Sequence, residues 1–416
     1  MSFESSSSDA RRAVITGIGV VSALGIGKAA FWAGLQAQRS PIRELTLFDT
    51  ADFRAKHAAW IDDWQPRQWI APHRLKRMDR FSQFACVAAH LAIADAGIEL
   101  SHENPSLRAG ISLGSAVGGF AHGEAQHGVF MAHGVKGIQP SLGVQCFGGS
   151  AQGNLAIEFG LQGPGVTNAN TCAAGNAALG DALRLIQYGS ADVVIAGAAE
   201  TPLSPLIFAA FDKIHTMARG GLYRPYHRHR DGFIIGEGAA LFVVESLAHA
   251  RRRNARILAE IAGYGLTNDA YHMSSPEPTG VALQAAMRLA LEDARVNAGA
   301  IDYINSHASG TPANDSNELK HIAAVFGDHA RRTPISGIKP FVGHTLGAAG
   351  ALETAACLLA MEHSWVPPTL HLDDIDPACL GFNLVPQQAQ EKVMRKVLSN
   401  SLGFSGINTS LVLVAE

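Results

Sequence analysis

Two stretches of small residues constrain what this chain can fold into. Residues 173–188 place Ala, Gly and Leu on nearly all faces of a predicted helix, and a second helix of this kind ends near residue 361. A helix without a polar face has nothing to present to water, so it is buried on all sides. We therefore expect the first helix to lie inside the molecule and the second to be its counterpart.

Apolar strands alternate with the helices. Residues 12–20 predict a buried strand that runs into a glycine turn, residues 80–96 a helix, and residues 192–197 another strand. This order predicts an α/β fold with covered sheets. The same order of strands and helices begins again after residue 257, which favours an internal duplication. We expect a disordered leader over residues 1–11, an N-terminal half over 12–250 and a C-terminal half over 251–416.

The composition argues against several classes of protein. The chain has 416 residues, of which 47% are hydrophobic and 17% charged, as in an ordered globular protein. A formal net charge of −3 provides no basic field for nucleic acid. The five cysteines are scattered and form no C-x-x-C pair, so neither a disulfide framework nor a zinc site is favoured. No apolar run is long enough to span a membrane, and a reducing cytoplasm is the expected location.

Cys172 lies where a strand-like run ends and the first small-residue helix begins. The free N–H groups in the first turn of a helix favour a thiolate, so this position predicts a lowered cysteine pKa. The small residues that follow leave room for a substrate carbonyl beside backbone N–H groups, as in an oxyanion hole. Free cysteines are often buried and inert, but the position at a helix start favours a nucleophile.

Two histidines lie in similar settings. His307 follows a predicted strand and precedes a turn rich in hydroxyl groups, and His344 lies between glycines at the start of the second small-residue helix. The field of a helix N-terminus disfavours imidazolium, and a neutral imidazole can donate one hydrogen bond to an oxygen that becomes anionic. Two such donors suit an enolate. Lys339, five residues before His344, is expected to have an interior role.

Three further patterns are weaker. His227 and His229 have no other ligands spaced to join them, so a metal site is not favoured. The segment 17–22 begins like a dinucleotide-binding fingerprint but ends in serine, which is too partial a match. The densest basic cluster of the first half is equally consistent with a solvated helix start and with a docking patch for an acidic partner; it consists of Arg74, Lys76 and Arg77.

With one cysteine and two histidines in this order, the chain resembles the β-ketoacyl-acyl-carrier-protein synthases, the condensing enzymes of the thiolase superfamily. The resemblance covers nearly the whole chain from about residue 12, and it is closest to the elongating class of type II fatty acid and polyketide synthesis. It rests on ordered motifs: Gly163-Pro-Gly-Val, Asn170-Thr-Cys-Ala-Ala-Gly, Arg224-Pro-Tyr-His, Asp269-Ala-Tyr-His, Asn305-Ser-His-Ala-Ser-Gly-Thr-Pro, Gly343-His-Thr-Leu-Gly and Leu402-Gly-Phe-Ser-Gly-Ile-Asn.

The resemblance implies the duplicated five-layer αβαβα thiolase fold, a dimer, and no cofactor of the enzyme's own. It implies that Cys172 accepts an acyl chain from the phosphopantetheine of an acyl carrier protein. Malonyl-carrier protein then loses CO₂, and the resulting enolate, stabilised by His307 and His344, attacks the acyl thioester. The second subunit of the dimer is expected to be another copy or a related chain-length-factor-type chain.

The resemblance also assigns supporting residues. Lys339 and Glu353 would support the histidines, and backbone N–H groups of Cys172 and Phe404 would form the oxyanion hole. Phe404 would also gate the acyl pocket. The basic cluster that begins at Arg74 would meet the acidic carrier protein. The residues expected to contact pantetheine are Ser274, Ser309 and Thr311.

The chain departs from the family pattern at several positions. Ala308 replaces the glycine that usually follows the first histidine, and Ser405 alters a loop at Phe404 that usually reads Gly-Phe-Gly-Gly-Thr-Asn. His227 stands where an aspartate is usual. A bulky aliphatic residue of the fatty-acid enzymes becomes Gly123, at a position that limits the acyl pocket at the dimer interface. We therefore expect a pocket opened for a long, rigid or aromatic chain, as in specialised polyketide or polyene synthesis.

Four alternatives stay open. Housekeeping fatty acid elongation fits the same motifs. A non-catalytic chain-length-factor-type partner typically lacks the nucleophilic cysteine, which this chain has. A degradative thiolase typically has a second catalytic cysteine near the C-terminus, where this chain has Phe404. A nicotinamide oxidoreductase would rest only on Gly17 and Gly19.

Overall fold

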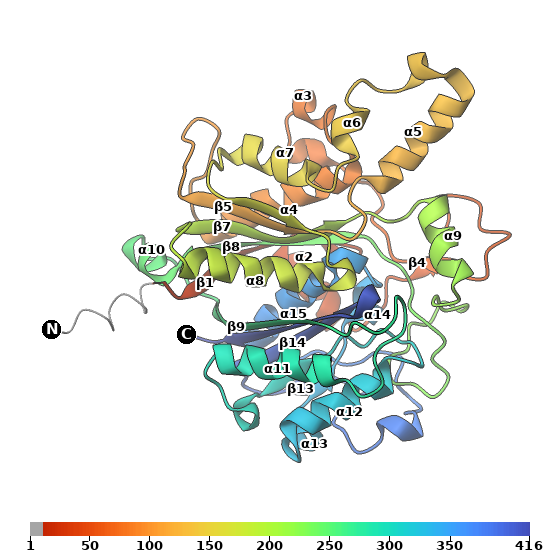
Figure 1. Ribbon diagram of the computed structural model, residues 1–416, viewed down its shortest axis with the longest axis vertical. Coiled ribbons are helices and arrows are strands. Elements are labelled where there is room, and N and C mark those ends of the chain that lie inside the picture. Colours follow the sequence, from red (N-terminus) through yellow and green to blue (C-terminus); the bar gives the residue numbers. More distant parts are fainter. Residues whose placement is uncertain (1–10) are drawn as a thin grey trace.

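The computed structural model describes residues 11–416, so the predicted leader lies outside the described residues except for Arg11. Figure 1 shows five layers, in which helices alternate with sheets from one side of the molecule to the other. The predicted duplicated αβαβα architecture is therefore confirmed.

Five strands of four or more residues from the first half lie in the main sheet. They are β1 (Ala13–Ser22), β5 (Ala109–Gly114), β6 (Gly165–Asn168), β7 (Val193–Glu200) and β8 (Gly238–Ser246). They pair in the order β6–β5–β7–β8–β1, with β5 parallel to both neighbours and β8 antiparallel to both. All of these strands except β6 are buried along their whole length, as expected for strands covered on both faces.

The second half repeats this plan. Its strands are β9 (Ala259–Asn268), β10 (Tyr303–Asn305), β11 (Ile335–Ser336), β14 (Lys396–Gly403) and β15 (Ile407–Val414). They pair in the order β11–β10–β14–β15–β9, with the same alternation of parallel and antiparallel neighbours as the first half. The two halves join where β1 and β9 pair, for example Ala13 with Ile261. The domain boundary near residue 250 stays a prediction.

The two small-residue helices form the middle layer between the sheets. They are α8 (Ala174–Gln187) and α15 (Ala349–His363), and residues 349–361 of α15 are all buried. An added Cβ on Gly175 would lie only 2.5 Å from the backbone nitrogen of Ala351. The helices can approach this closely because glycine and alanine leave little side chain between their backbones. Small residues in both helices thus bring the loops at their N-termini together.

Four helices cover the outer faces of the sheets. The helices α4 (Arg80–Ala96) and α7 (Ser150–Phe159) cover the first half, and α11 (Val281–Asp293) and α12 (Asp315–Phe326) cover the second (Figure 1). α4 matches its predicted range. It begins after Asp79, whose side chain accepts the backbone N–H of Ser82, and it ends at Gly97, whose φ of 60° is the left-handed conformation that glycine adopts readily.

Further helices and two-residue strands complete the described part of the chain. The remaining helices are α2 (Lys28–Gln36), α3 (Pro72–Leu75), α5 (Phe120–His133), α6 (Leu142–Gln145), α9 (Pro205–Lys213), α10 (Leu247–Arg252), α13 (His329–Arg332) and α14 (Lys339–Val342). The two-residue strands are β2 (Gly25–Ile26), β3 (Arg43–Glu44), β4 (His57–Ala58), β12 (Trp365–Val366) and β13 (Gln390–Glu391). Between residues 11 and 416, no helix has both the length and the apolar character needed to cross a membrane.

Candidate active site

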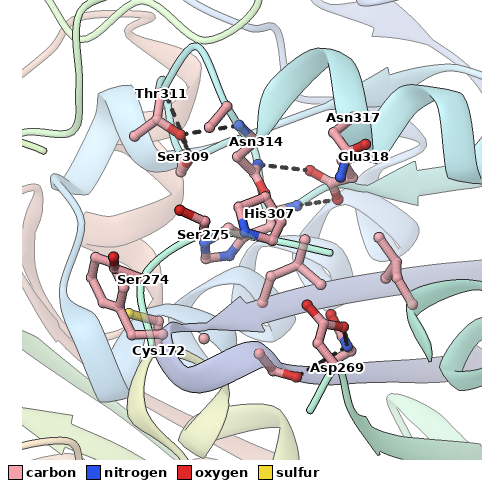
Figure 2. Close-up of a pocket in the computed structure, with 18 of the residues that line it drawn as sticks. Cys172, Asp269, Ser274, Ser275, His307, Ser309, Thr311, Asn314, Asn317 and Glu318 are labelled. Carbon is pink, nitrogen blue, oxygen red and sulfur yellow. Dashed lines mark hydrogen bonds between the residues drawn. The ribbon is translucent and has the colours of Figure 1, made fainter. Parts of the chain in front are cut away.

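Four of the predicted catalytic residues line a single cavity: Cys172, His307, His344 and Phe404. Each comes from a different segment of the chain, and Figure 2 shows Cys172 and His307 within this pocket. Cys172 lies in the short 3-10 helix η3 (Thr171–Ala173) that leads into α8. The duplicated fold therefore gathers residues that are far apart in the sequence.

His307 and His344 approach the cavity from the second half. His307 follows β10, whereas His344 follows α14 and precedes the short helix η5 (Leu346–Ala348), which leads into α15. The centroids of the two imidazole rings lie 5.4 Å apart, at an angle of 74°. Both side chains are almost completely buried. Two imidazoles at this distance can contact the same small oxygen-containing group.

The environment of Cys172 corrects one expectation from the sequence. The helix start was expected to lower its pKa, but burial instead raises the pKa of the thiol to about 12. The charge of Lys339 and a hydrogen bond from the backbone N–H of Phe404 oppose this rise without cancelling it. Burial removes water from around the thiolate, and the free-energy cost of this desolvation exceeds the stabilisation that Lys339 and Phe404 provide. The resting side chain is therefore a thiol.

Backbone contacts fix the tautomer of His344. The N–H of Leu346 donates a hydrogen bond to Nδ1 of His344 at 3.2 Å. An imidazole nitrogen that accepts a hydrogen bond carries no proton, so the proton of the neutral ring lies on Nε2. Burial, followed by the charge of Lys339, lowers the pKa of His344 well below its usual value. His344 is therefore a neutral ring that can donate from Nε2.

A lysine fixes His307 in the same way. Nζ of Lys339 lies 3.3 Å from Nδ1 of His307, and it also donates to the backbone oxygen of His307. Since an ammonium group only donates, Nδ1 is the acceptor and Nε2 keeps the proton. Burial is the main cause that lowers the pKa of His307 well below its usual value, with Lys339 and His344 adding to it. The site thus contains two neutral imidazoles, each with an Nε2–H to donate.

Lys339 and Glu353 form a buried ion pair beneath the histidines. Both side chains are 1% exposed, and Nζ of Lys339 donates to Oε1 of Glu353. The second carboxylate oxygen accepts a hydrogen bond from the hydroxyl of Ser401 at 3.3 Å. The ammonium group is thereby held between Glu353 and His307. The structure thus brings Lys339 into contact with His307, and Glu353 into contact with Lys339.

Two buried carboxylates at the site were missed by sequence reasoning. Glu318 on α12 accepts the backbone N–H groups of His307 at 2.7 Å and Ala308 at 3.0 Å. Glu200 at the end of β7 accepts the backbone N–H of Gly347 at 3.0 Å. Burial raises the pKa of each carboxyl to about 7. No local pattern marks these residues, because their partners come from distant segments; a buried acid at a strand end was the only available signal for Glu200.

The residues expected to contact pantetheine lie together. Ser274, Ser309 and Thr311 all line the cavity that contains Cys172, and Figure 2 shows them along its wall. The hydroxyl oxygens of Ser309 and Thr311 lie 2.8 Å apart and share a hydrogen bond. Their contact with pantetheine stays a prediction.

Other predicted residues lie outside the cavity. Gly123 is on α5 and is not among the residues that line it. An added Cβ on Gly123 would come 3.2 Å from Sγ of Cys146. In the basic cluster, Arg74 forms an ion pair with Glu158 at 2.8 Å, so it is already occupied, whereas Lys76 and Arg77 are exposed. The acyl pocket at Gly123 and the docking patch stay predictions.

Two of the departures from the family pattern occur where the backbone is unusual. Ser405 has φ 66° and ψ 13°, and Ala308 has φ 44°. Both values are in the left-handed region, which glycine adopts at less cost than serine or alanine. The side chain of Ser405 is exposed, and its backbone N–H donates to the carbonyl of Met273 at 2.7 Å. The loop at Phe404 is thus held in a conformation that its serine does not favour.

No group of three or more His, Cys, Asp or Glu side chains across residues 11–416 is arranged to hold a metal ion. His227 instead lies 3.2 Å from Asp373, and its Nδ1 accepts the backbone N–H of His229 at 2.9 Å. The two histidines that could have indicated a metal site are therefore engaged in local contacts.

The arrangement of the cysteine and the two histidines suits a condensation reaction. It combines a thiol at the start of a buried helix with two neutral imidazole donors in the same cavity. With the duplicated five-layer fold, this site defines a condensing enzyme of the thiolase superfamily.

Comparison with known families identifies the chain more closely. The family model for the N-terminal domain of beta-ketoacyl synthases matches residues 10–250, and that for the C-terminal domain matches residues 258–373. The chain belongs to the β-ketoacyl synthase family. It is an acyltransferase that catalyses β-ketoacyl synthase condensation.

Similar proteins come from two branches of the family. A putative polyketide beta-ketoacyl synthase 1 from Streptomyces cyaneus is 40% identical over 97% of this chain and 98% of the relative. The 3-oxoacyl-(acyl-carrier-protein) synthase 2 of Coxiella burnetii is 38% identical with the same coverage. Because relatives from both branches match to a similar degree, the similarity shows the condensation reaction that the two branches share. It does not assign the chain to polyketide or to fatty acid synthesis.

Two solved structures are similar along nearly their whole length. The ishigamide ketosynthase/chain length factor has a TM-score of 0.91 and 36% identity, covering 98% of this chain and 99% of that one. A type II polyketide ketosynthase, AntDE, solved with its acyl-carrier protein AntF, has a TM-score of 0.89, 31% identity and the same coverage.

Proposed function

We propose that Cys172 carries the acyl chain as a thioester and that His307 and His344 stabilise the enolate formed from malonyl-carrier protein. The observation that carries this proposal is the shared tautomer of the two histidines. Each accepts a hydrogen bond at Nδ1 and so presents Nε2–H. Two neutral donors are complementary to an oxygen that gains negative charge during the reaction.

The first half-reaction loads the enzyme. Sγ of Cys172 attacks the thioester carbonyl of an acylated pantetheine, and backbone N–H groups of Cys172 and Phe404 donate to the resulting oxyanion. The bond from the carbonyl carbon to the pantetheine sulfur breaks. The proton lost from Cys172 goes to the departing pantetheine thiolate, so the charge balances.

The second half-reaction forms the carbon–carbon bond. The malonyl thioester loses CO₂, and the electron pair of the broken bond moves into an enolate whose oxygen accepts hydrogen bonds from His307 and His344. The enolate carbon attacks the acyl carbonyl on Cys172. The C–S bond then breaks, and the Cys172 thiolate takes a proton from solvent. Lys339 keeps His307 in the required tautomer throughout.

We also propose an acyl carrier protein and a second subunit as partners. The exposed cations Lys76 and Arg77 would contact the acidic carrier protein, and Ser274, Ser309 and Thr311 its pantetheine arm. Exposed apolar side chains of α5 to α7 support a subunit interface that is either homodimeric or heterodimeric; they include Phe130, Met131, Val144, Phe147 and Ile157. A cytoplasmic location belongs to the same proposal.

Specialised polyketide or polyene synthesis is the pathway we favour. Its support is Gly123, where a small residue replaces a bulky aliphatic of the fatty-acid enzymes, and the similarity to polyketide ketosynthases. Housekeeping fatty acid elongation is the second candidate, favoured by the relative from Coxiella burnetii. A non-catalytic partner subunit is a weaker alternative, because the chain has both the cysteine and the two donors.

The test is to incubate the protein with a panel of acyl-carrier proteins and to measure the mass added to the Cys172 peptide. We expect an acyl adduct on Cys172, with preference for polyenoyl or aryl chains. A preference for saturated fatty acyl chains would select fatty acid elongation instead. No adduct with any donor would contradict an active synthase.

A further inference from the structure

Glu200 has a role that none of its sequence neighbours suggests. It is the last residue of β7 and is completely buried, yet it forms no ion pair among the described residues. Its carboxylate instead accepts four hydrogen bonds. Oε1 accepts the hydroxyl of Ser115 at 2.9 Å and the backbone N–H of Val117 at 3.2 Å; Oε2 accepts the N–H groups of Ala116 at 2.5 Å and Gly347 at 3.0 Å.

These four donors come from two separate loops. Three belong to the loop after β5, where Ala116 and Val117 pack in the same apolar cluster as Cys172. The fourth belongs to the turn that follows His344. The loops meet so closely that an added Cβ on Gly347 would lie 2.4 Å from the backbone nitrogen of Ala116 and 2.5 Å from Oε2 of Glu200. Glu200 therefore fills the junction between them.

The turn held by Glu200 is the one that orients His344. Successive backbone amides of this turn have different acceptors: the N–H of Leu346 donates to Nδ1 of His344, and the N–H of Gly347 donates to Glu200. A shift of Gly347 would also move Leu346, because a planar peptide group joins them. The position of the His344 ring thus depends on a carboxylate that does not touch it.

We propose that Glu200 is a positioning residue for His344, which it holds in donor geometry through Gly347 and Leu346. This inference rests on the proposed role of His344 in enolate stabilisation. The two carboxylate oxygens accept from two donors each, whereas an amide offers one oxygen and presents an NH₂ group to the other pair of donors. A glutamine therefore leaves donors without an acceptor, and an aspartate, which is one methylene shorter, cannot reach both loops unless one of them moves.

The test compares the two half-reactions in Glu200→Gln, Glu200→Asp and the unmodified enzyme. Acylation is measured as the mass added to Cys172, and decarboxylation as the CO₂ released from malonyl-carrier protein. Both are normalised to the number of Cys172 sites that can be acylated. We expect Glu200→Gln to retain acylation and to lose about 10²-fold in decarboxylation, the order of effect of a misplaced catalytic group. Glu200→Asp keeps the charge, so its decarboxylation rate should lie between those of the unmodified enzyme and Glu200→Gln.

Glu245→Gln is the matched control. Glu245 is also a buried carboxylate, but it lies at the opposite end of the β7–β8 pair and binds Arg253 and His249. We expect it to leave the ratio of the half-reactions unchanged. Should Glu200→Gln fail to fold, Gly347→Ala displaces the same turn and is expected to give the same selective loss.

The outcomes separate this inference from the proposed function. Suppose that the unmodified enzyme acylates and condenses. If the two half-reactions of Glu200→Gln then fall together, or if neither falls, only the role of Glu200 is overturned. An unmodified enzyme that neither acylates Cys172 nor releases CO₂ would contradict the proposed function itself.

Discussion

Nζ of Lys339 lies 3.3 Å from Nδ1 of His307, and this contact determines which nitrogen of the ring can meet substrate. The ammonium group is buried and compensated by Glu353, which the hydroxyl of Ser401 contacts in turn. A chain of contacts therefore runs from Ser401 on β14 to the imidazole. The histidine donates from Nε2 because Lys339 occupies the other side of the ring.

Replacing Lys339 should destabilise the fold as well as the site. Lys339→Met leaves Glu353 buried without its partner, which costs about 3–5 kcal/mol of unfolding free energy. The double variant Lys339→Met, Glu353→Leu removes both charges and should recover most of that loss. Decarboxylation should stay low in both variants, because Nδ1 of His307 has lost its donor. Denaturant unfolding and CO₂ release measure the two effects; an unchanged stability of Lys339→Met would contradict the buried pair.

The high thiol pKa predicts how Cys172 reacts with alkylating agents. Since only the thiolate reacts, and burial raises the pKa to about 12, the rate for the free enzyme should rise about tenfold per pH unit from about pH 7 to about pH 10. Iodoacetamide labelling, followed by mass analysis of the Cys172 peptide, measures this rate. The urea-unfolded chain serves as the control and should level off near the ordinary thiol pKa. A plateau near neutral pH in the folded enzyme would show a stabilised thiolate instead.

The pocket hypothesis at Gly123 predicts a change in acyl length. Gly123→Ile should shift acylation of Cys172 toward shorter chains, because a branched side chain would fill the space that glycine leaves. Cys146→Ala is added to relieve the 3.2 Å approach of the new Cβ to Cys146. Gly128→Ile on the same helix is the matched control, since a Cβ there meets nothing within 4 Å. An identical chain-length profile in all variants would sink the hypothesis.

Sequence reasoning succeeded where the signal is local. The periodicity of α4 predicted Arg80–Ala96, and the two small-residue stretches predicted the middle helices α8 and α15, which Cys172 and His344 precede in the chain. These features depend on neighbours three or four residues apart, which a sequence displays directly.

Sequence reasoning failed where a property depends on residues that are close in space but distant in the sequence. The raised pKa of Cys172 results from burial by loops of both halves, which no residue next to it reveals. Glu200 and Glu318 were missed because their partners are backbone amides of distant segments. The ion pair of Arg74 with Glu158 was likewise not visible, because Glu158 lies on another helix; the docking role of Arg74 stays a prediction.

The central claim is that Cys172 holds the acyl chain while the two histidines stabilise the enolate. The most direct test loads Cys172 with an acyl group, adds malonyl-carrier protein, and follows CO₂ release and loss of the acyl group from the Cys172 peptide in a single turnover. We predict that the two occur in equal amounts. We also predict that His307→Ala and His344→Ala retain acylation but release CO₂ about 10²–10³-fold more slowly. Release of CO₂ at the unmodified rate in both histidine variants, or an acyl group found on a residue other than Cys172, would contradict the account.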